Sequence, residues 1–249
     1  MCSSDLGTIS AARELSRRIS RPNVMIKIPA TDAGLEAIST VVGDGISVNV
    51  TLIFGLSRYR QVVEAHVAGV ESLMRTDPAK APAVASVASF FISRVDNAID
   101  PLLESKNVPV GQTAIAQAKL AYRDFVNHVA SPRWSALATR GAQPQRPLWA
   151  STSTKNPSFS PTLYVDELIG PDTVNTLPDA TVEAFDQSGR VARTIDRDVA
   201  TAEHHLQEVR RAGIDVEQVA AQLETAGLKS FQESFDDLLA TLANKAATR

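Results

Sequence analysis

The sequence predicts an α/β fold in which helices cover a parallel sheet, on two observations. First, short runs rich in apolar and β-branched residues alternate with longer amphipathic runs, which is the order of elements in repeated βα units. Second, the 249 residues are 44% hydrophobic and 21% charged, a composition that can bury one sizeable core. No internal repeat, low-complexity tract or linker indicates a second domain.

Helices and strands alternate through the first part of the chain. Pro22 disfavours continuation of the first helix. Thr31 or Asp32 is a suitable N-cap for the second helix, and Ser57 for the third. In order, we predict a helix over residues 8–20, a strand over 23–30, a helix from 31 or 32 to the glycines at 43 and 45, a strand over 46–54, a helix over 57–75 and a strand over 84–92.

The second part contains two more strands and a long helical end. The predicted elements are helices over residues 95–104 and 112–130, the latter N-capped near Gly111, a strand over 145–154, a helix over 162–169 and a short strand over 173–178. From Asp196 onward the chain reads as helical, with breaks near Gly213 and Gly227. Its last segment carries an apolar stripe that we expect to be buried: Phe231, Phe235, Leu238, Leu239 and Leu242. Five such strands fit either a doubly wound sheet or part of a (β/α)8 barrel, and periodicity does not decide between them.

Composition argues against several classes of function. A net charge of −3 and a pI near 5.8 give no basic footprint, so we expect no nucleic-acid partner. Cys2 is the one cysteine, which rules out an internal disulfide and fits a reducing compartment. The sequence shows no Cys and His set with zinc-ligand spacing, no apolar run near the roughly 20 residues of a membrane span, and no signal-peptide core. We expect a cytoplasmic protein with no metal and no membrane contact.

A lysine interrupts the apolar run NVMIKIPAT of residues 23–31. An unpaired ammonium is costly in an apolar medium unless it loses its proton or finds a partner, so Lys27 needs an explanation. In the next strand Asn49 and Thr51 share one parity with Ser47, which gives that strand a polar face. Asn49 and Thr51 could bind substrate hydroxyls or hold a water for proton transfer.

Polar and cationic residues also follow the later strands. Ser89 lies late in the third strand with Arg94 beyond its end, and Ser153 lies in the fourth strand with Lys155 just past it. Parallel α/β folds place active sites at the carboxyl ends of their strands. A desolvated, neutral lysine amine there can attack a carbonyl carbon, and the resulting imine is an electron sink for making or breaking C–C bonds. Arg94 and Lys155 could hold a phosphate.

Structural alternatives stay open for these residues. Lys27 could be a snorkelling edge residue or half of an ion pair, and the polar strand residues could be satisfied core groups. Arg94 could pair with Asp96 or Asp100. Four further residues are given no functional role: His204 and His205 as solvated surface, and Trp134 and Trp149 as packing residues.

Four segments, in this order, resemble transaldolase of the longer, actinobacterial type: IKIPATDAGLEAI, SVNVTLIF, ASFFISRVD and ASTSTKNP. The resemblance begins near Thr8, so residues 1–7 are interpreted as a non-family segment and residues 8–249 as the family domain. It implies an incomplete (β/α)8 TIM barrel with about five of eight βα units, strands four to eight, plus C-terminal helices. The three preceding units are expected to be missing, with an acid–base aspartate, an asparagine near a Thr-Asn-Pro motif and a water-positioning glutamate.

The resemblance also implies a function and residue roles. A member of this family is a transferase of the pentose phosphate pathway. It moves a dihydroxyacetone unit from sedoheptulose 7-phosphate to glyceraldehyde 3-phosphate, giving erythrose 4-phosphate and fructose 6-phosphate, with no cofactor. By resemblance, Lys27 is the Schiff-base lysine, and Asn49 and Thr51 are active-site polar residues, Thr51 helping to hold the catalytic water. The implied substrate and phosphate contacts are Ser89, Arg94, Ser153 and Lys155, the last where shorter members have an arginine.

Two other functions stay open. A Schiff-base aldolase of the same barrel type would cleave fructose 6-phosphate without an acceptor. A chain with five of eight strands could instead be an inactive fragment that exposes apolar strand edges. The expected partners are small sugar phosphates, and the oligomeric state is not predicted.

Overall fold

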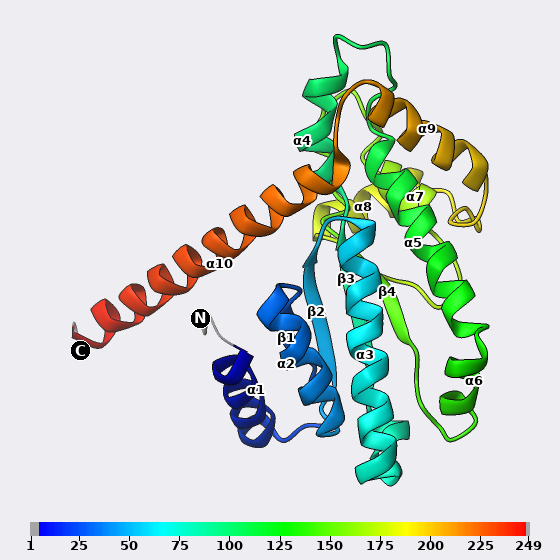
Figure 1. The fold of residues 1–249 in the computed structure, drawn as a ribbon. Helices are drawn as coiled ribbons and strands as arrows, with labels where there is room; N and C mark the ends of the chain where they lie inside the picture. Colours follow the sequence, from blue (N-terminus) through cyan, green and yellow to red (C-terminus); the bar gives the residue numbers. More distant parts are fainter. Residues whose placement is uncertain (1–4, 248–249) are drawn as a thin grey trace.

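The computed structural model describes residues 5–247, and its centre is a parallel sheet of five strands (Figure 1). The strands lie side by side in chain order: β1 (Ile26–Pro29), β2 (Val48–Ile53), β3 (Ser86–Phe91), β4 (Gln145–Ala150) and β5 (Val174–Asn175). The predicted α/β class is confirmed. A doubly wound sheet reverses its strand order at a switch point, whereas consecutive barrel strands do not, so the sequential order favours winding of the barrel type.

The helices agree with the predicted order, with additions. They are α1 (Asp5–Ile19), α2 (Asp32–Gly43), α3 (Leu56–Thr76), the 3-10 helix η1 (Pro78–Ala83), α4 (Ser93–Leu103), α5 (Thr113–Val129), α6 (Pro132–Ala138), α7 (Leu163–Glu167), α8 (Asp179–Ser188), α9 (Val199–Arg211) and α10 (Val216–Ala247). We did not predict η1, α6 or α8. Ser131 caps α6 by accepting from the Trp134 N–H and precedes Pro132, a start signal that the sequence did contain. Residues 1–4, with Cys2, lie outside the described residues, and α1 begins at Asp5, earlier than predicted.

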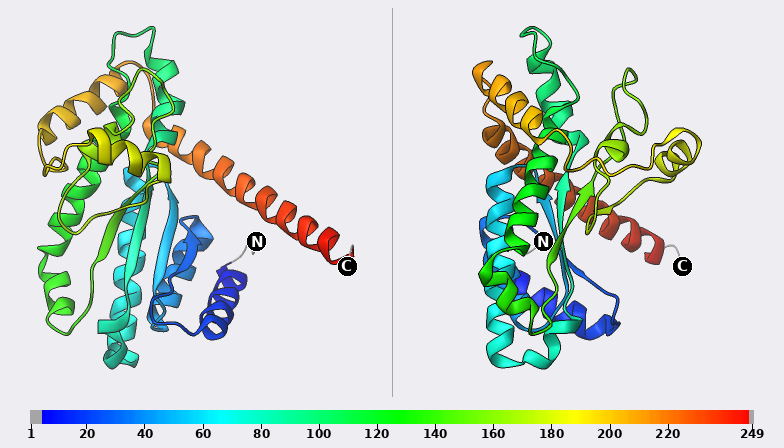
Figure 2. Two further views of the ribbon diagram at one scale, coloured as in Figure 1. Left: turned by 180° about the vertical axis from the view of Figure 1, so that it is seen from behind. Right: turned by 90° about the vertical axis from the view of Figure 1, so that its right-hand side faces the viewer.

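The two faces of the sheet differ because side chains alternate along each strand. Helices α2, α3 and α5 pack along one face, which the right-hand view of Figure 2 shows edge-on. Five strand residues of that face are at most 1% exposed: Ile28, Val50, Ala88, Phe90 and Trp149. Trp134 is buried as well, so both tryptophans are packing residues as predicted. The opposite face carries the polar strand residues that the sequence singled out.

Two predicted helix boundaries are wrong. The N-cap of α3 is Gly55, and Ser57 lies within the first turn, where its N–H donates to Glu217 Oε1 of α10 at 3.1 Å. A carboxylate distant in sequence therefore satisfies a free N–H of this helix start. At the other position, α10 continues through Gly227 without a break. A Cβ there would lie 2.9 Å from Leu52 Cδ2, so this glycine allows close packing instead of ending a helix.

The apolar stripe of the last helix is exposed, contrary to the prediction. Its side chains Phe235, Leu238, Leu239 and Leu242 are 45 to 54% exposed, and Phe231 alone of the stripe packs against the core. In Figure 1, the C-terminal part of α10, which carries these side chains, runs past β1 and away from the sheet. Periodicity identified the stripe correctly but carries no information about what covers it.

Two aspartates of α4 cap the start of α5. Asp96, fully buried, accepts hydrogen bonds from the Ala114 N–H at 2.7 Å and from the Tyr164 hydroxyl at 2.9 Å. Asp100 accepts from the Gly111 N–H at 3.0 Å. The capping expected near Gly111 thus comes from carboxylates of the preceding helix. Burial raises the pKa of Asp96 to about 7; the hydrogen bonds oppose this rise and the nearby charge of Asp100 adds to it.

Replacing Asp96 by Asn should remove much of the pH dependence of stability between about pH 4 and pH 7. The folded pKa lies above the unfolded one, so the folded state holds the extra proton in this window. Wild-type stability therefore falls as the pH rises through it, by at most about 1.4 kcal/mol per pH unit. Asparagine keeps an acceptor for Ala114 and does not titrate. Urea unfolding between pH 4 and pH 8 measures the effect, and an unchanged slope in D96N would assign it to another group.

Candidate functional site

Three polar strand residues lie side by side on the open face of the sheet. Lys27 of β1 pairs in register with Asn49 of β2, and Asn49 pairs with Val87 of β3. The Ser89 hydroxyl, further along β3, donates to Asn49 Oδ1 at 2.7 Å. Because register partners in parallel strands share a face, Lys27, Asn49 and Ser89 lie together as predicted. The bond from Ser89 occupies the amide oxygen of Asn49 and leaves its NH2 group as the donor that a ligand could use.

Lys27 is exposed, so the prediction of an amine held away from water is wrong. The physical reason is its place on β1, an edge of the sheet, where water reaches one side of the residue. Its Nζ lies 5.5 Å from the ring centroid of Phe231 on α10. None of the ion pairs within the described part of the chain includes Lys27, whereas an edge position does fit the snorkelling alternative. Geometry alone therefore does not make Lys27 a nucleophile.

Thr51 combines burial with an unused hydroxyl. It is 2% exposed, and its Oγ1 has no hydrogen-bond partner among the described residues. The next residue, Leu52, has a φ of +63° although it is buried, and β2 shifts register against β3 between Val50 and Ile53. A left-handed φ at a non-glycine residue costs about 1 to 3 kcal/mol and is enriched at functional sites. The pairing of β2 with β3 is therefore irregular directly after Thr51 and resumes at Ile53, near the carboxyl edge where ligands bind.

Arg94 lies in the first turn of α4, directly beyond β3. Its guanidinium carbon is 5.1 Å from the centroid of the Phe91 ring. The alternative pairing with Asp96 or Asp100 is not found among the described residues, because both carboxylates accept backbone N–H groups at the start of α5 instead. Arg94 is thus held over an aromatic ring with its charge available.

The segments after β3 and β4 are tied together. The Ser93 N–H donates to the Ser151 carbonyl at 2.9 Å, and the two hydroxyls are 2.8 Å apart. Beyond Ser151, Lys155 is exposed and its Nζ donates to Ser153 Oγ at 3.1 Å. Ser93 was not among the predicted site residues, although it directly follows an apolar strand run. The cationic residues therefore follow two neighbouring strands whose ends are hydrogen-bonded to each other.

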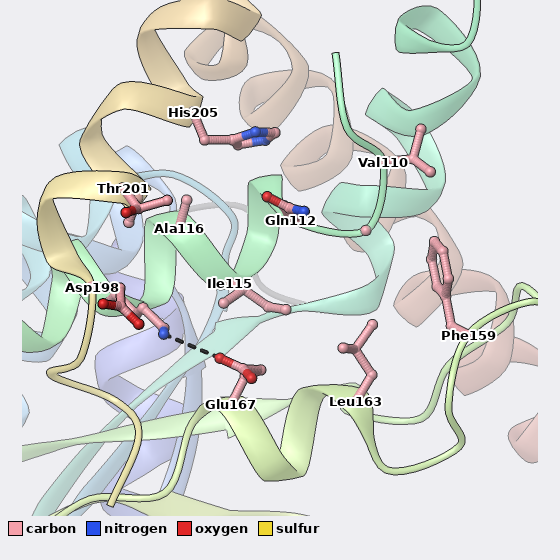
Figure 3. A pocket seen from close by; sticks show the side chains of 13 residues that line it. Val110, Gln112, Ile115, Ala116, Phe159, Leu163, Glu167, Asp198, Thr201 and His205 are labelled. Atoms are coloured by element: carbon pink, nitrogen blue, oxygen red, sulfur yellow. Dashed lines mark hydrogen bonds and ion pairs between the residues drawn. The ribbon is translucent and has the colours of Figure 1, made fainter. Parts of the chain in front are cut away.

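A separate cleft of about 400 Å³ lies among α5, α7 and α9 (Figure 3). Buried Lys119 donates to Glu167 Oε2 at 3.1 Å. His205 is 3% exposed, and its Nε2 is 3.0 Å from Thr113 Oγ1, so its prediction as solvated surface is wrong, while neighbouring His204 is exposed. Burial lowers the pKa of His205. The predicted site residues do not line this cleft, whose paired polar groups connect the three helices.

Residues 5–247 contain neither a group of candidate metal ligands nor a helix that could span a membrane. This part of the chain has no group of three His, Cys, Asp or Glu side chains that could hold a metal ion. Its helices include none that is both long enough and apolar enough to cross a bilayer. Even α10, with 32 residues, carries charged side chains along its length.

Comparisons with known proteins identify relatives along nearly the whole chain. A family model described as Transaldolase/Fructose-6-phosphate aldolase matches residues 2–242. The chain is 47% identical to a transaldolase of Frankia alni over 244 residues, which are 96% of this chain. It is 46% identical to a transaldolase of Neisseria gonorrhoeae over 95% of this chain, and 47% identical to transaldolase 1 of Streptomyces coelicolor over 94% of this chain. It spans 66%, 66% and 63% of these three relatives, slightly less than two thirds of each.

Thr51→Val should raise the free energy of unfolding by about 1 kcal/mol, because it replaces a buried, unpaired hydroxyl with a methyl group of similar size. Thr152→Val is the matched control. Thr152 is also fully buried, but its hydroxyl donates to Asn175 Oδ1 at 2.8 Å, so its loss should lower stability by about 1 to 3 kcal/mol. Urea unfolding measures both variants. A T51V variant as destabilised as T152V would mean that the Thr51 hydroxyl is paired in solution.

Proposed function

Since the chain belongs to the transaldolase and fructose-6-phosphate aldolase family, we propose that it carries out Schiff-base chemistry on ketose phosphates, with Lys27 as the nucleophile. The proposed reaction is transfer of a dihydroxyacetone unit from sedoheptulose 7-phosphate to glyceraldehyde 3-phosphate. The observation that supports it best is the grouping of Lys27, Asn49 and Ser89 on one face. Register and a hydrogen bond bring together three residues from separate strands, each of the type that the chemistry needs.

In the proposed reaction the neutral amine of Lys27 attacks the keto carbon of the donor sugar, and loss of water gives a protonated imine. The electron pair of the C3–C4 bond moves toward the imine as the C4 hydroxyl loses its proton. An aldose phosphate leaves, and a three-carbon enamine stays on the lysine. C3 of the enamine then attacks the aldehyde carbon of the acceptor, whose oxygen takes a proton, and water hydrolyses the new imine. Atoms and charge balance without an oxidant or reductant.

Two residues of β2 have free hydrogen-bonding groups suited to this sequence. The unpaired Thr51 hydroxyl could hold the water that is lost and regained during imine formation and hydrolysis. The NH2 group of Asn49, oriented by Ser89, could donate to a hydroxyl of the bound sugar. Ser89 then acts partly through Asn49, because it holds the amide in the orientation that presents this donor.

The phosphate is assigned to the cationic residues beyond β3 and β4. Arg94 could bind phosphate oxygens with its planar fork, while Lys155 supplies a point charge next to Ser153. Their segments are joined through Ser93 and Ser151, which keeps both cations at one corner of the carboxyl edge. A sugar that reaches from this corner to Lys27 would pass over Ser89 and Asn49.

Cleavage of fructose 6-phosphate without an acceptor is a second candidate, because the matching family model covers both activities. The two differ in what becomes of the three-carbon enamine. An aldolase releases dihydroxyacetone into solution, whereas a transaldolase needs an acceptor. Measuring glyceraldehyde 3-phosphate release with and without erythrose 4-phosphate separates them: release that continues beyond one equivalent per chain only when the acceptor is present supports transfer.

Borohydride reduction in the presence of fructose 6-phosphate should attach the sugar-derived group covalently to Lys27, because a hydride reduces the imine to a stable amine. Peptide mass spectrometry locates the adduct. Lys27→Met should abolish it, whereas Lys106→Met, which removes an exposed lysine far along the chain from the site, should leave it intact. An adduct that persists in K27M, or an unlabelled wild-type chain, would refute the assignment.

Arg94→Ala should raise the fructose 6-phosphate concentration needed for half-maximal labelling by roughly tenfold, as expected for loss of a charged hydrogen bond. Unphosphorylated fructose should label R94A and the wild-type protein equally, because the lost contact is to phosphate. Lys155→Ala should act in the same direction but less, since a lysine lacks bidentate geometry. Equal losses with both sugars would assign Arg94 to folding or to another part of the sugar.

A further inference from the structure

Helix α10 begins beside the N-terminus of α3 and crosses the carboxyl edge of the sheet toward β1 (Figure 1). Asp215 starts it by accepting from the N–H groups of Glu217 and Gln218 at 3.0 and 3.2 Å. Glu217 then accepts from the Ser57 N–H at 3.1 Å. The first turn of α10 is therefore fixed to the first turn of α3.

An ion-pair chain holds the next turns. Glu224 accepts from Arg58 Nε at 3.1 Å, and Arg58 also donates to Asp32 Oδ1 at 2.7 Å. Arg58 and Glu224 are 20% and 17% exposed, so this pair is largely shielded from water. These two ion pairs connect α10 to the starts of α3 and α2, the two helices that follow β2 and β1. The direction of α10 across the strand ends is thus set by several independent contacts.

The same face of α10 reaches two residues of the proposed site. Glu217, Glu224, Gly227 and Phe231 are separated by seven, three and four residues, so they lie along one side of the helix. Gly227 contacts Leu52, the strained residue directly after Thr51. One turn further, the Phe231 ring lies 5.5 Å from Lys27 Nζ. A single helix side therefore contacts both the end of β2 and the proposed nucleophile.

We propose that α10 positions the reactive ends of β1 and β2, with Gly227 seating the helix on Leu52 and Phe231 orienting the Lys27 side chain in its ammonium and iminium forms; this rests on the proposed function. Phe231 is a positioning residue that acts through Lys27. Its ring attracts the positively charged ammonium and iminium forms but not the neutral amine. Without this contact the long lysine stem on an edge strand would sample many directions in water. A Cβ at position 227 would lie 2.9 Å from Leu52 Cδ2, so we expect a larger residue there to lift the helix and to move the ring away from the lysine.

The contact can be measured without any sugar. Lysines are reductively methylated with 13C-formaldehyde, and the N-methyl signal of Lys27, assigned by its absence in K27M, should show a ring-current shift from Phe231. Phe231→Leu should lose that shift, Phe231→Tyr should keep it, and Phe235→Leu, an exposed position one turn further, should leave it unchanged. A Lys27 signal that is the same in wild type and F231L would overturn the proposed contact.

The positioning role is tested on the same variants by borohydride labelling with fructose 6-phosphate. F231L should label about two- to fivefold more slowly, the range expected for an exposed cation–π contact, and F231Y should label like wild type. Gly227→Ala should lose both ring shift and labelling rate although alanine favours a helix, while Thr225→Ala on the exposed side should lose neither.

The outcomes separate the two proposals. Wild-type labelling that F231L and G227A retain in full overturns the positioning role and leaves the proposed function standing. Absence of wild-type labelling, with the ring shift intact, refutes the proposed function and with it any role for this contact in the reaction. Loss of labelling in F231Y equal to that in F231L also counts against the proposal, because the aromatic face is retained there.

Discussion

The structure depends on one constraint, which is that side chains of paired parallel strands alternate together between two faces. One face is filled by helices α2, α3 and α5, and its residues Val50, Ala88 and Trp149 are fully buried. The remaining positions must point the other way, and they include the polar residues Lys27, Asn49 and Ser89. The alternation of side chains that packs the core therefore also places the candidate site. A register slip of one residue would bury the lysine among the helices and expose the core.

The site departs from ideal geometry where β2 ends. Thr51 has a buried hydroxyl without a described partner, and Leu52 is held at a left-handed φ. Each feature costs stability, and the surrounding packing must compensate for both. Helix α10 contributes to this compensation because Gly227 packs on Leu52 and the pair of Glu224 with Arg58 holds the helix down. Strain at the strand end and the course of the last helix are thus physically connected.

Exposure changes the chemical argument for Lys27. A desolvated amine would have been activated by its surroundings alone, but the edge position of β1 leaves this amine in contact with water. The proposal therefore rests on family membership and on the neighbouring side chains, with Phe231 as the contact that orients the amine. The apolar stripe of α10 is exposed to water as Lys27 is. The relatives are longer than this chain by about half.

The sequence by itself determined the α/β class, the order of the strands along the chain, the parity of the polar residues and the family resemblance, because these follow from local periodicity and short motifs. Tertiary structure decided the rest. His205 is buried against Thr113. Asp96 accepts from the start of α5, Glu217 accepts from the start of α3, and α10 continues through Gly227. Lys27 and the stripe at Leu238 are exposed. Each of these depends on which distant segment lies alongside a residue, and a pattern within one segment carries no information about its neighbours in space.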